Sequence, residues 1–177
     1  MEFSELILKR QSTREYSDNP VEQAKIDKCI EAARMAPSAC NSQPWKYIVI
    51  DNKELKEKIA ECAASMGMNK FTFQAPVIVA VVLEKMNLSA SIGSVIKNKE
   101  FSLLDIGLSV GQFCLQAAEL NLGTCIMGWF NEKKVKKLLG VPISKRVPLI
   151  ITLGYSDSLQ RNKIRKGSDQ ICSFNKY

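Results

Sequence analysis

The sequence predicts an α+β protein that folds as a single domain over residues 1–177. Pro76–Leu83 is a continuous apolar run rich in β-branched residues, as expected of a strand buried on both faces. Residues 102–121 have the length and apolar character of a long helix. Helices and strands interleave without strict β-α-β spacing, and no linker or repeat divides the chain, so the α+β class is favoured.

The first half of the chain predicts three helices and two strands. Residues 2–9 form a short helix, and Asn19-Pro20 starts a second one, because asparagine caps helices and proline suits the first turn. Pro37 ends this helix. A strand at 47–50, a helix at 53–64 and the strand at 76–83 follow. Residues 85–100 lack a clear period and are expected to form a mobile or partly helical excursion.

The helix at 102–121 has an unusual distribution of polar residues. They recur at steps of four, three, four and three, and so form one narrow stripe on a helix that is otherwise apolar: Asp105, Ser109, Gln112, Gln116 and Glu119. Such a helix should be almost wholly buried. Gly107 and Gly111 would allow another backbone to approach closely. We favour a helix that forms a dimer, and the alternative is a central helix of a monomeric core.

The last third of the chain predicts two further strands and one helix. Gly123 ends the long helix, and a strand at 124–127, a helix at 131–139 and a strand at 147–155 follow. The tail from Arg161 to Tyr177 is first basic and then mixed, and Ile171 and Phe174 are available to anchor it.

The composition excludes several kinds of chemistry. The chain contains no histidine, which rules out a Ser-His or Cys-His nucleophile pair and a histidine-bearing zinc site, so no metal site is expected. Its six cysteines contain no C-x-x-C pair and are expected to be reduced, with Cys40 a candidate for exposure. The acidic N-terminus does not resemble a secretory signal, and no segment has the unbroken apolar length of a bilayer span. A cytoplasmic location is expected.

The net charge of +7 predicts an anionic partner. One local run of lysines lies at 132–137, where Val135, Leu138 and Leu139 recur at helical spacing. We therefore interpret these lysines as a solvated helix face. Nucleic-acid binding is the alternative, but the sequence has no recognition-helix or stacking motif.

Three segments could together bind a flat, phosphorylated ligand. Pro37-Ser38-Ala39-Cys40-Asn41-Ser42-Gln43-Pro44-Trp45 is a proline-framed loop of small and amide residues. The other two segments supply cations: Arg10-Gln11-Ser12-Thr13-Arg14 and Arg161-Asn162-Lys163-Ile164-Arg165-Lys166. Flavin mononucleotide (FMN) requires charge-assisted contacts to its phosphate, polar partners along its ribityl chain and a backbone N–H near its N5 atom. Its redox chemistry needs no protein acid or base.

These segments resemble the flavin-binding elements of the nitroreductase family, in the family's order. The resemblance implies a mainly antiparallel sheet flanked by helices, in an intertwined homodimer with FMN at the interface. By the same resemblance, Arg10 contacts the phosphate, Gln11 and Ser12 its ribityl side, and Arg14 the pyrimidine edge, while Lys163 and Arg165 close on the phosphate.

The loop residues Pro37, Ser38, Asn41 and Gln43 would cover the ring from the other subunit. Met127 and Gly128 resemble the turn that brings backbone to N5. Asn69 resembles a further cofactor amide.

The resemblance implies an FMN-dependent oxidoreductase that uses NADH or NADPH to reduce nitroaromatics, quinones or related acceptors. Because the chemistry would occur at the flavin N5, no protein residue is expected to be catalytic. The expected reaction is a ping-pong hydride transfer, because no G-x-G-x-x-G motif provides a separate dinucleotide fold. The alternatives are another task on the same fold, such as dehalogenation, dehydrogenation or flavin modification, and a basic nucleic-acid-binding module. Residues 65–75 and 85–100 are the two candidates for covering the flavin.

Overall fold

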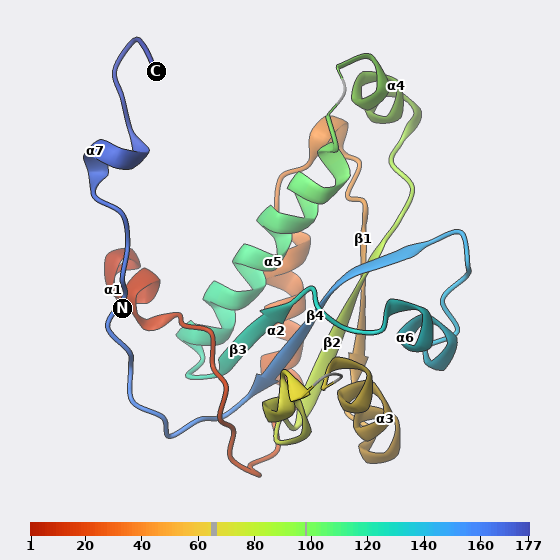
Figure 1. The fold of residues 1–177 in the computed structure, drawn as a ribbon, viewed down its shortest axis with the longest axis vertical. Helices are drawn as coiled ribbons and strands as arrows, with labels where there is room; N and C mark the ends of the chain where they lie inside the picture. Colours follow the sequence, from red (N-terminus) through yellow and green to blue (C-terminus); the bar gives the residue numbers. More distant parts are fainter. Residues whose placement is uncertain (65–66, 98) are drawn as a thin grey trace.

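The computed structural model describes residues 1–64, 67–97 and 99–177, and its strands form one four-stranded antiparallel sheet (Figure 1). The strand order is β1-β2-β4-β3. The strands are β1 (Trp45–Ile50), β2 (Val77–Leu83), β3 (Gly123–Met127) and β4 (Arg146–Gly154). Pairs such as Ile48–Ala80 and Ala80–Ile150 fix the register, and every pairing is antiparallel. The predicted α+β class is confirmed.

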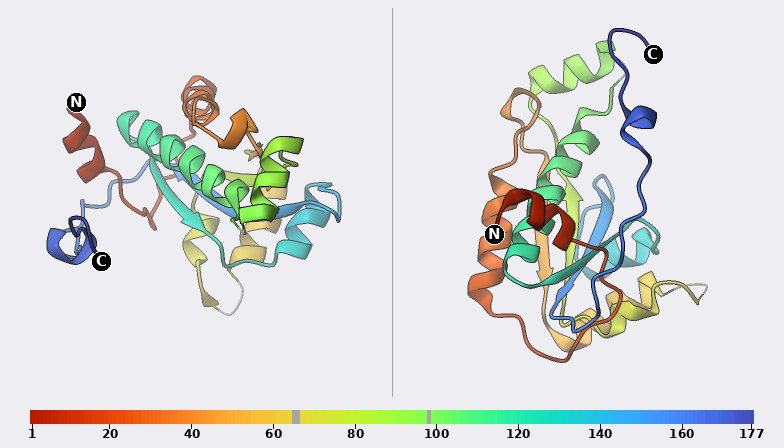
Figure 2. Two further views of the ribbon diagram at one scale, coloured as in Figure 1. Left: turned by 90° about the horizontal axis from the view of Figure 1, so that it is seen from above. Right: turned by 90° about the vertical axis from the view of Figure 1, so that its left-hand side faces the viewer.

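Helices cover both faces of the sheet (Figure 2). One face packs on α2 (Gln23–Arg34) and α5 (Phe101–Glu119), and the other on α3 (Lys53–Ala63) and α6 (Glu132–Leu138). Alternate residues of β2 enter the two cores: Val79 faces α2 and α5, whereas Ile78 faces α3. Six of the seven residues of β2 are buried, as its β-branched run predicts.

The second helix starts later than the sequence predicted. Asn19 and Pro20 lie outside α2, whose N-cap is Glu22. The chain before the helix is bonded to the residue that follows β4, because Ser17 N–H donates to the Tyr155 carbonyl at 3.0 Å. The Glu22 carboxylate accepts a hydrogen bond from the Tyr155 hydroxyl at 2.6 Å. Because of these tertiary contacts, the helix begins at Gln23 and not at the local capping signal, Asn19-Pro20.

Two residues of the polar stripe of α5, Asp105 and Ser109, point into the core, whereas part of the helix's apolar face is exposed in the single chain. The sequence predicted that a second subunit would contribute much of the burial of this helix. Asp105 and Ser109 are buried, and the Ser109 hydroxyl bonds to the Tyr47 hydroxyl and donates to the Ala33 carbonyl, both at 2.8 Å. On the opposite side, Leu104 is 62% exposed and Leu108 is 52% exposed. Helix α5 thus hydrogen-bonds to the core through its polar side chains and presents an apolar face outward.

The remaining segments surround this body. The excursion at 85–100 contains α4 (Leu88–Lys97), with Asn98 outside the described residues. In the segment 65–75, residues 65 and 66 lie outside the described chain and η3 (Lys70–Phe73) is a short 3-10 helix. On α6, Val135 is buried and Lys133, Lys134 and Lys137 are exposed, so its lysines form a solvated face as predicted.

The two chain ends lie on the same side of the molecule (Figures 1 and 2). There α1 (Phe3–Lys9) lies beside the tail, which continues away from the body through α7 (Ser168–Ile171). Ile171 and Phe174 are exposed, so they do not anchor the tail on its own chain as the sequence suggested.

Helix α5 also has the length and apolar composition of a membrane span. It packs against α2 and the sheet and buries Asp105 and Ser109 in that core. These contacts are typical of a core helix, and a core helix can have the same length and apolar composition as a membrane span.

Candidate functional site

The segment 10–14 lies beside β3 and is joined to it by a single β-bridge. Thr13 N–H donates to the Thr124 carbonyl at 2.8 Å, and Ser12 pairs with Thr124 in a parallel bridge. The two backbones approach so closely that a Cβ on Gly123 would lie 2.6 Å from the Thr13 hydroxyl oxygen. Tyr16 holds the end of the segment, because its buried hydroxyl donates to the Thr13 carbonyl at 2.9 Å. The position of the segment is therefore fixed by packing.

The C-terminal tail is hydrogen-bonded to this segment. Arg161 N–H donates to the Gln11 side-chain oxygen at 3.0 Å, and the Gln160 amide donates to the Leu8 carbonyl at 2.6 Å. The Lys163 ammonium donates to the Arg10 carbonyl, and the Arg161 guanidinium to the Ser12 carbonyl. These contacts join residues about 150 positions apart in sequence and bring both groups of predicted phosphate ligands together.

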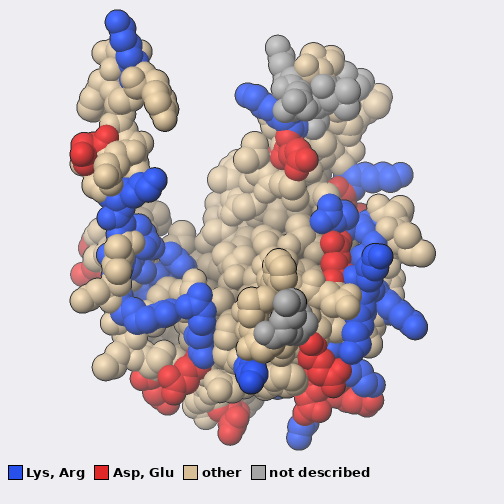
Figure 3. Space-filling model, in the orientation of Figure 1, with Lys and Arg blue, Asp and Glu red and all other residues tan. Residues whose placement is uncertain are grey.

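The result is a cationic cleft of about 330 Å³ between the segment 10–14 and the tail. Its lining consists of Arg10, Gln11, Ser12, Arg14, Arg161, Asn162, Lys163, Ile164 and Arg165. Five of these residues are cations, and among the described residues no Asp or Glu lines the cleft. Figure 3 shows Lys and Arg side chains gathered along this side of the molecule, separate from a second group near α6.

The cations of the cleft repel one another. The pKa of Lys163 is lowered first by desolvation and then by the positive charges of Arg10, Arg165 and Arg161. A bound anion would remove this repulsion, and arginine guanidinium groups suit bidentate contact with a phosphoryl group. The cleft is therefore suited to bind a phosphorylated ligand.

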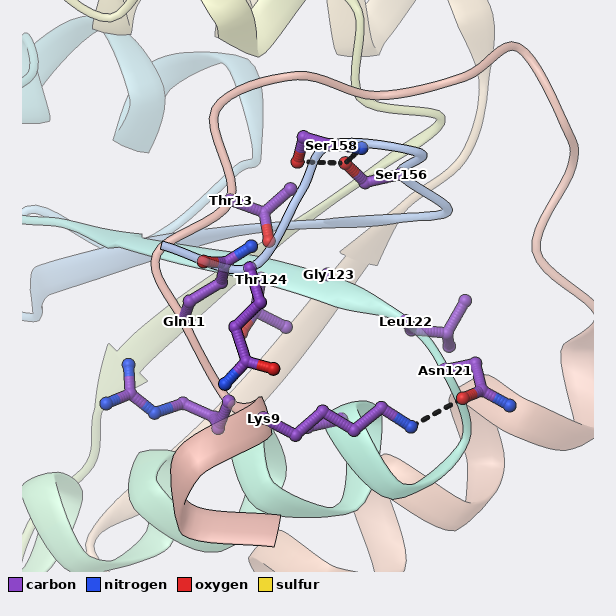
Figure 4. Close-up of a pocket in the computed structure, with 12 residues that line it drawn as sticks. Lys9, Gln11, Thr13, Asn121, Leu122, Gly123, Thr124, Ser156 and Ser158 are labelled. Carbon is purple, nitrogen blue, oxygen red and sulfur yellow. Dashed lines mark hydrogen bonds between the residues drawn. The ribbon is translucent and has the colours of Figure 1, made fainter. Parts of the chain in front are cut away.

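A second pocket, of about 260 Å³, lies on the other side of the segment 10–13 (Figure 4). Its polar groups mainly satisfy each other: Lys9 bonds to the Asn121 side-chain oxygen, and the Ser156 and Ser158 hydroxyls bond to each other at 2.7 Å. Figure 4 shows both pairs on the pocket wall. We interpret these contacts as the support that fixes the segment behind the cationic cleft.

The predicted loop residues lie elsewhere in the same chain. Residues 37–43, which we call the proline loop, include η1 (Ala39–Asn41) and sit near the N-terminal end of α5, where Asp105 accepts a hydrogen bond from Ala39 N–H at 3.1 Å. Arg10 instead lies beside Gly111, Cys114 and Leu115, in the C-terminal half of α5. Nine residues separate Asp105 from Cys114, which corresponds to about 14 Å of helix axis. Pro37, Asn41 and Gln43 are exposed, and Ser38 is half-buried.

The end of β3 was predicted to supply backbone near the flavin. The Met127 side chain is buried in the core on the α3 side, so only the backbone of Met127 and Gly128 is available there. Asn69 is not free for a cofactor: its amide nitrogen donates to the Ala63 carbonyl at 3.4 Å and to the Trp129 carbonyl at 3.2 Å. It supports the turn after β3 instead.

The structure thus brings six of the predicted ligands into one cleft: Arg10, Gln11, Ser12, Arg14, Lys163 and Arg165. Arg161 and Asn162 also line the cleft; they belong to the same predicted segment, but no contact to the cofactor was predicted for them. Their position within the same basic run, Arg161–Lys166, was the available signal.

The fold and the cleft define an α+β protein with a cationic cleft built from two segments that lie far apart in its sequence. The chain belongs to the nitroreductase family, whose model matches residues 7–67 and 63–155. It is 33% identical over 147 residues to an FMN reductase [NAD(P)H] of Bacillus subtilis, covering 74% of this chain and 56% of that protein. It is 25% identical over 173 residues to an oxygen-insensitive NADPH nitroreductase of Helicobacter pylori, covering 80% and 81% of the two chains.

Solved structures share the fold. The structure of an FMN-dependent nitroreductase of Clostridium difficile R20291 matches with a TM-score of 0.78 and 29% identity. The match covers 97% of this chain and 98% of that chain. The nitroreductase fold that the sequence motifs predicted is confirmed.

Proposed function

We propose that this protein is an FMN-dependent oxidoreductase that takes hydride from NADH or NADPH and reduces nitroaromatics, quinones or related acceptors. The cationic cleft carries the proposal: five cations gather there without a carboxylate among the described lining residues. Family membership agrees with it, and so do the matched relatives named as an FMN reductase and an NADPH nitroreductase.

The described residues fit the cofactor. Arg10, Lys163 and Arg165 would hold the phosphate, Gln11 and Ser12 its ribityl side, and Arg14 the pyrimidine edge. The backbone at Met127 and Gly128 would lie near N5. When bound, the flavin supplies the hydride chemistry, so the chain needs no acid or base of its own. The nicotinamide and the acceptor use the same flavin in turn, in a ping-pong order.

The protein works as a homodimer in this proposal, with two sites at the interface. The proline loop and the cationic cleft lie near opposite ends of α5 in one chain. Two copies of α5 packed antiparallel across a two-fold axis would place the loop of one chain beside the cleft of the other. The exposed apolar face around Leu104 and Leu108 supplies a contact surface, and open space lies around the missing Cβ atoms of Gly107 and Gly111.

Residues 1–177 act as one FMN-binding domain in this proposal, and the partners are a second copy, FMN, the nicotinamide and a small acceptor. A nucleic-acid or membrane partner is not part of it. We also place the protein in the cytoplasm, because all six cysteines are free thiols, as is usual in a reducing compartment.

A visible absorption spectrum tests the proposal. The purified protein, reconstituted with FMN if necessary, should show the flavin bands and should bleach on anaerobic addition of NADH or NADPH. Adding a quinone or nitroaromatic should restore the bands. A protein that binds no FMN after reconstitution would overturn the proposed function, and bleaching without reoxidation by these acceptors would overturn the substrate class.

A further inference from the structure

The proline loop has a backbone conformation that its residues do not favour. Cys40, Asn41 and Gln43 have φ angles of 50°, 52° and 47°, in the left-handed region. A non-glycine residue in this region costs on the order of 1 kcal/mol or more, although asparagine tolerates it better than most. Three such residues within four positions will not keep this shape through local preference. Contacts from outside the loop must hold it.

Part of the support comes from within the loop. Gln43 N–H donates to the Ser38 hydroxyl oxygen at 2.9 Å, and the Gln43 amide donates to the Asn41 side-chain oxygen at 3.0 Å. Both bonds use exposed groups that water can replace, so they add little rigidity alone. Both bonds join residues of the loop to each other, so they do not fix the loop to the rest of the protein.

Two residues from other elements supply the external support. The Asn87 amide donates to the Cys40 carbonyl at 2.7 Å, and Asn87 N–H donates to the Ser42 hydroxyl oxygen at 2.8 Å. On the inner side, the carboxylate of Asp105 accepts from Ala39 N–H at 3.1 Å. Asp105 is only 5% exposed, so α5 fixes it in place. The loop is thus clamped between α5 and the segment that precedes α4.

Asn87 also caps α4. Its side-chain oxygen accepts from Ala90 N–H at 2.9 Å, and its carbonyl accepts from Ser91 N–H at 3.0 Å, so it caps the first turn of this helix. The two ends of one side-chain amide therefore contact different elements: the oxygen caps α4 and the nitrogen holds the loop at Cys40.

We propose that Asn87 and Asp105 are positioning residues that hold the proline loop of one subunit in the shape that closes the FMN site of its partner, with Asn87 coupling this loop to α4. Neither residue lines the cationic cleft, so both act through the loop. The proposal rests on the proposed function, because it requires FMN and a dimer.

The variant Asn87→Asp separates the two roles of Asn87. Aspartate keeps a cap oxygen for Ala90 N–H but removes the donor to the Cys40 carbonyl. We expect the dissociation constant for FMN to rise about fivefold, as for the loss of one hydrogen bond, with α4 still protected in hydrogen exchange. Asp105→Ala should weaken FMN binding comparably, and Asp105→Asn, which keeps an acceptor for Ala39 N–H, should restore it.

The matched control is Asn52→Ala. Asn52 caps α3 by accepting from Leu55 N–H at 3.0 Å, remote from the proline loop in sequence. This variant should lower the melting temperature without changing FMN affinity. If Asn87→Asp changes the dissociation constant less than twofold, or if the control changes it as much, the positioning role is wrong.

Mixed dimers test which site the loop serves. With Arg165→Ala in one chain and Asn87→Asp in the other, both changes fall on the same site, so one site should keep the wild-type affinity. With both changes in one chain and none in its partner, each site should carry one defect and neither should bind normally. The reverse pattern would show that the loop serves its own chain and would overturn the inference.

The outcome for the wild-type protein separates the two proposals. If wild-type protein binds no FMN, the proposed function fails. If it binds FMN as a monomer, FMN binding stands, but the dimer and this inference are both overturned.

Discussion

The two parts of the proposed site are built in opposite ways. The cationic cleft is completed within one chain, where backbone bonds along β3 and the tail hold its residues in ordinary conformations. The proline loop has left-handed backbone at three non-glycine residues, and its exposed side chains face away from their own core. In the proposed function, this difference means that one chain would bind the phosphate by itself, whereas the loop would act only when it meets a second subunit.

The largest effect is expected from a charge on the outer face of α5. Leu108→Glu places a carboxylate on the surface through which the two parts would meet, and burying an unpaired charge is strongly unfavourable. We expect a monomer that loses bound flavin, measured by sedimentation and absorbance. Ile143→Glu makes the same change at a residue that is 96% exposed and lies outside α5, and it should remain dimeric and yellow. A dimeric Leu108→Glu protein would contradict the proposed interface.

Removal of a single cleft cation should have the next largest effect. Arg165→Ala deletes a charge-assisted contact worth about 1.5–3 kcal/mol, so the dissociation constant for FMN should rise roughly 10- to 150-fold. Lys166→Ala removes an adjacent charge that does not line the cleft and should change affinity little. Equal effects of the two variants would mean that the tail attracts FMN only through its overall charge.

A smaller effect should follow from pushing the segment 10–14 away from β3. Gly123→Ala adds a Cβ at 2.6 Å from the Thr13 hydroxyl oxygen, and such overpacking costs about 1–3 kcal/mol. Both the melting temperature and FMN affinity should fall. Gly93→Ala in α4, where the nearest atom would be 3.9 Å from the new Cβ, is the control and should leave affinity unchanged.

The smallest effect concerns pH. The folded protein lowers the pKa of Lys163, so charging this lysine opposes folding at any pH below its folded pKa, and the penalty disappears as pH rises above its unfolded pKa. A bound phosphate favours the charged lysine, so FMN affinity should decline as pH rises through the range in which Lys163 loses its proton. Titrations with Lys163→Met should lack this component of the pH dependence.

The sequence predicted most of the elements but not how their surfaces are used. The β-branched run of β2 and the apolar spacing of the helix at 53–64 were sufficient signals, because each depends mainly on burial. The start of α2 was wrong because the contacts of Ser17 and Glu22 with Tyr155 outweigh the signal at Asn19-Pro20.

Helix α5 shows a second limit. Periodicity located the stripe of Asp105 and Ser109, but a period alone does not state whether the stripe faces the core or the solvent. The partners that make the inward orientation favourable, Ala39 N–H and the Tyr47 hydroxyl, come from distant parts of the chain. In the site, the sequence motifs identified residues that line one cleft, whereas the distance of the proline loop from this cleft within one chain is seen only in the structure.

The hydrogen bonds between residues 8–12 and the tail have consequences for the synthesis and the proteolysis of the protein. Residues 8–11 and 160–163 meet beside the cleft where the nucleotide would be held, so a ligand there would fasten together two segments that lie about 150 positions apart. During synthesis the cleft can be completed only after residues 161–165 have been made, when every strand of the sheet is already in the chain. Cleavage of the chain between Gly154 and Arg161 would therefore separate three of the five cleft cations from the rest of the protein without cutting a strand of the sheet.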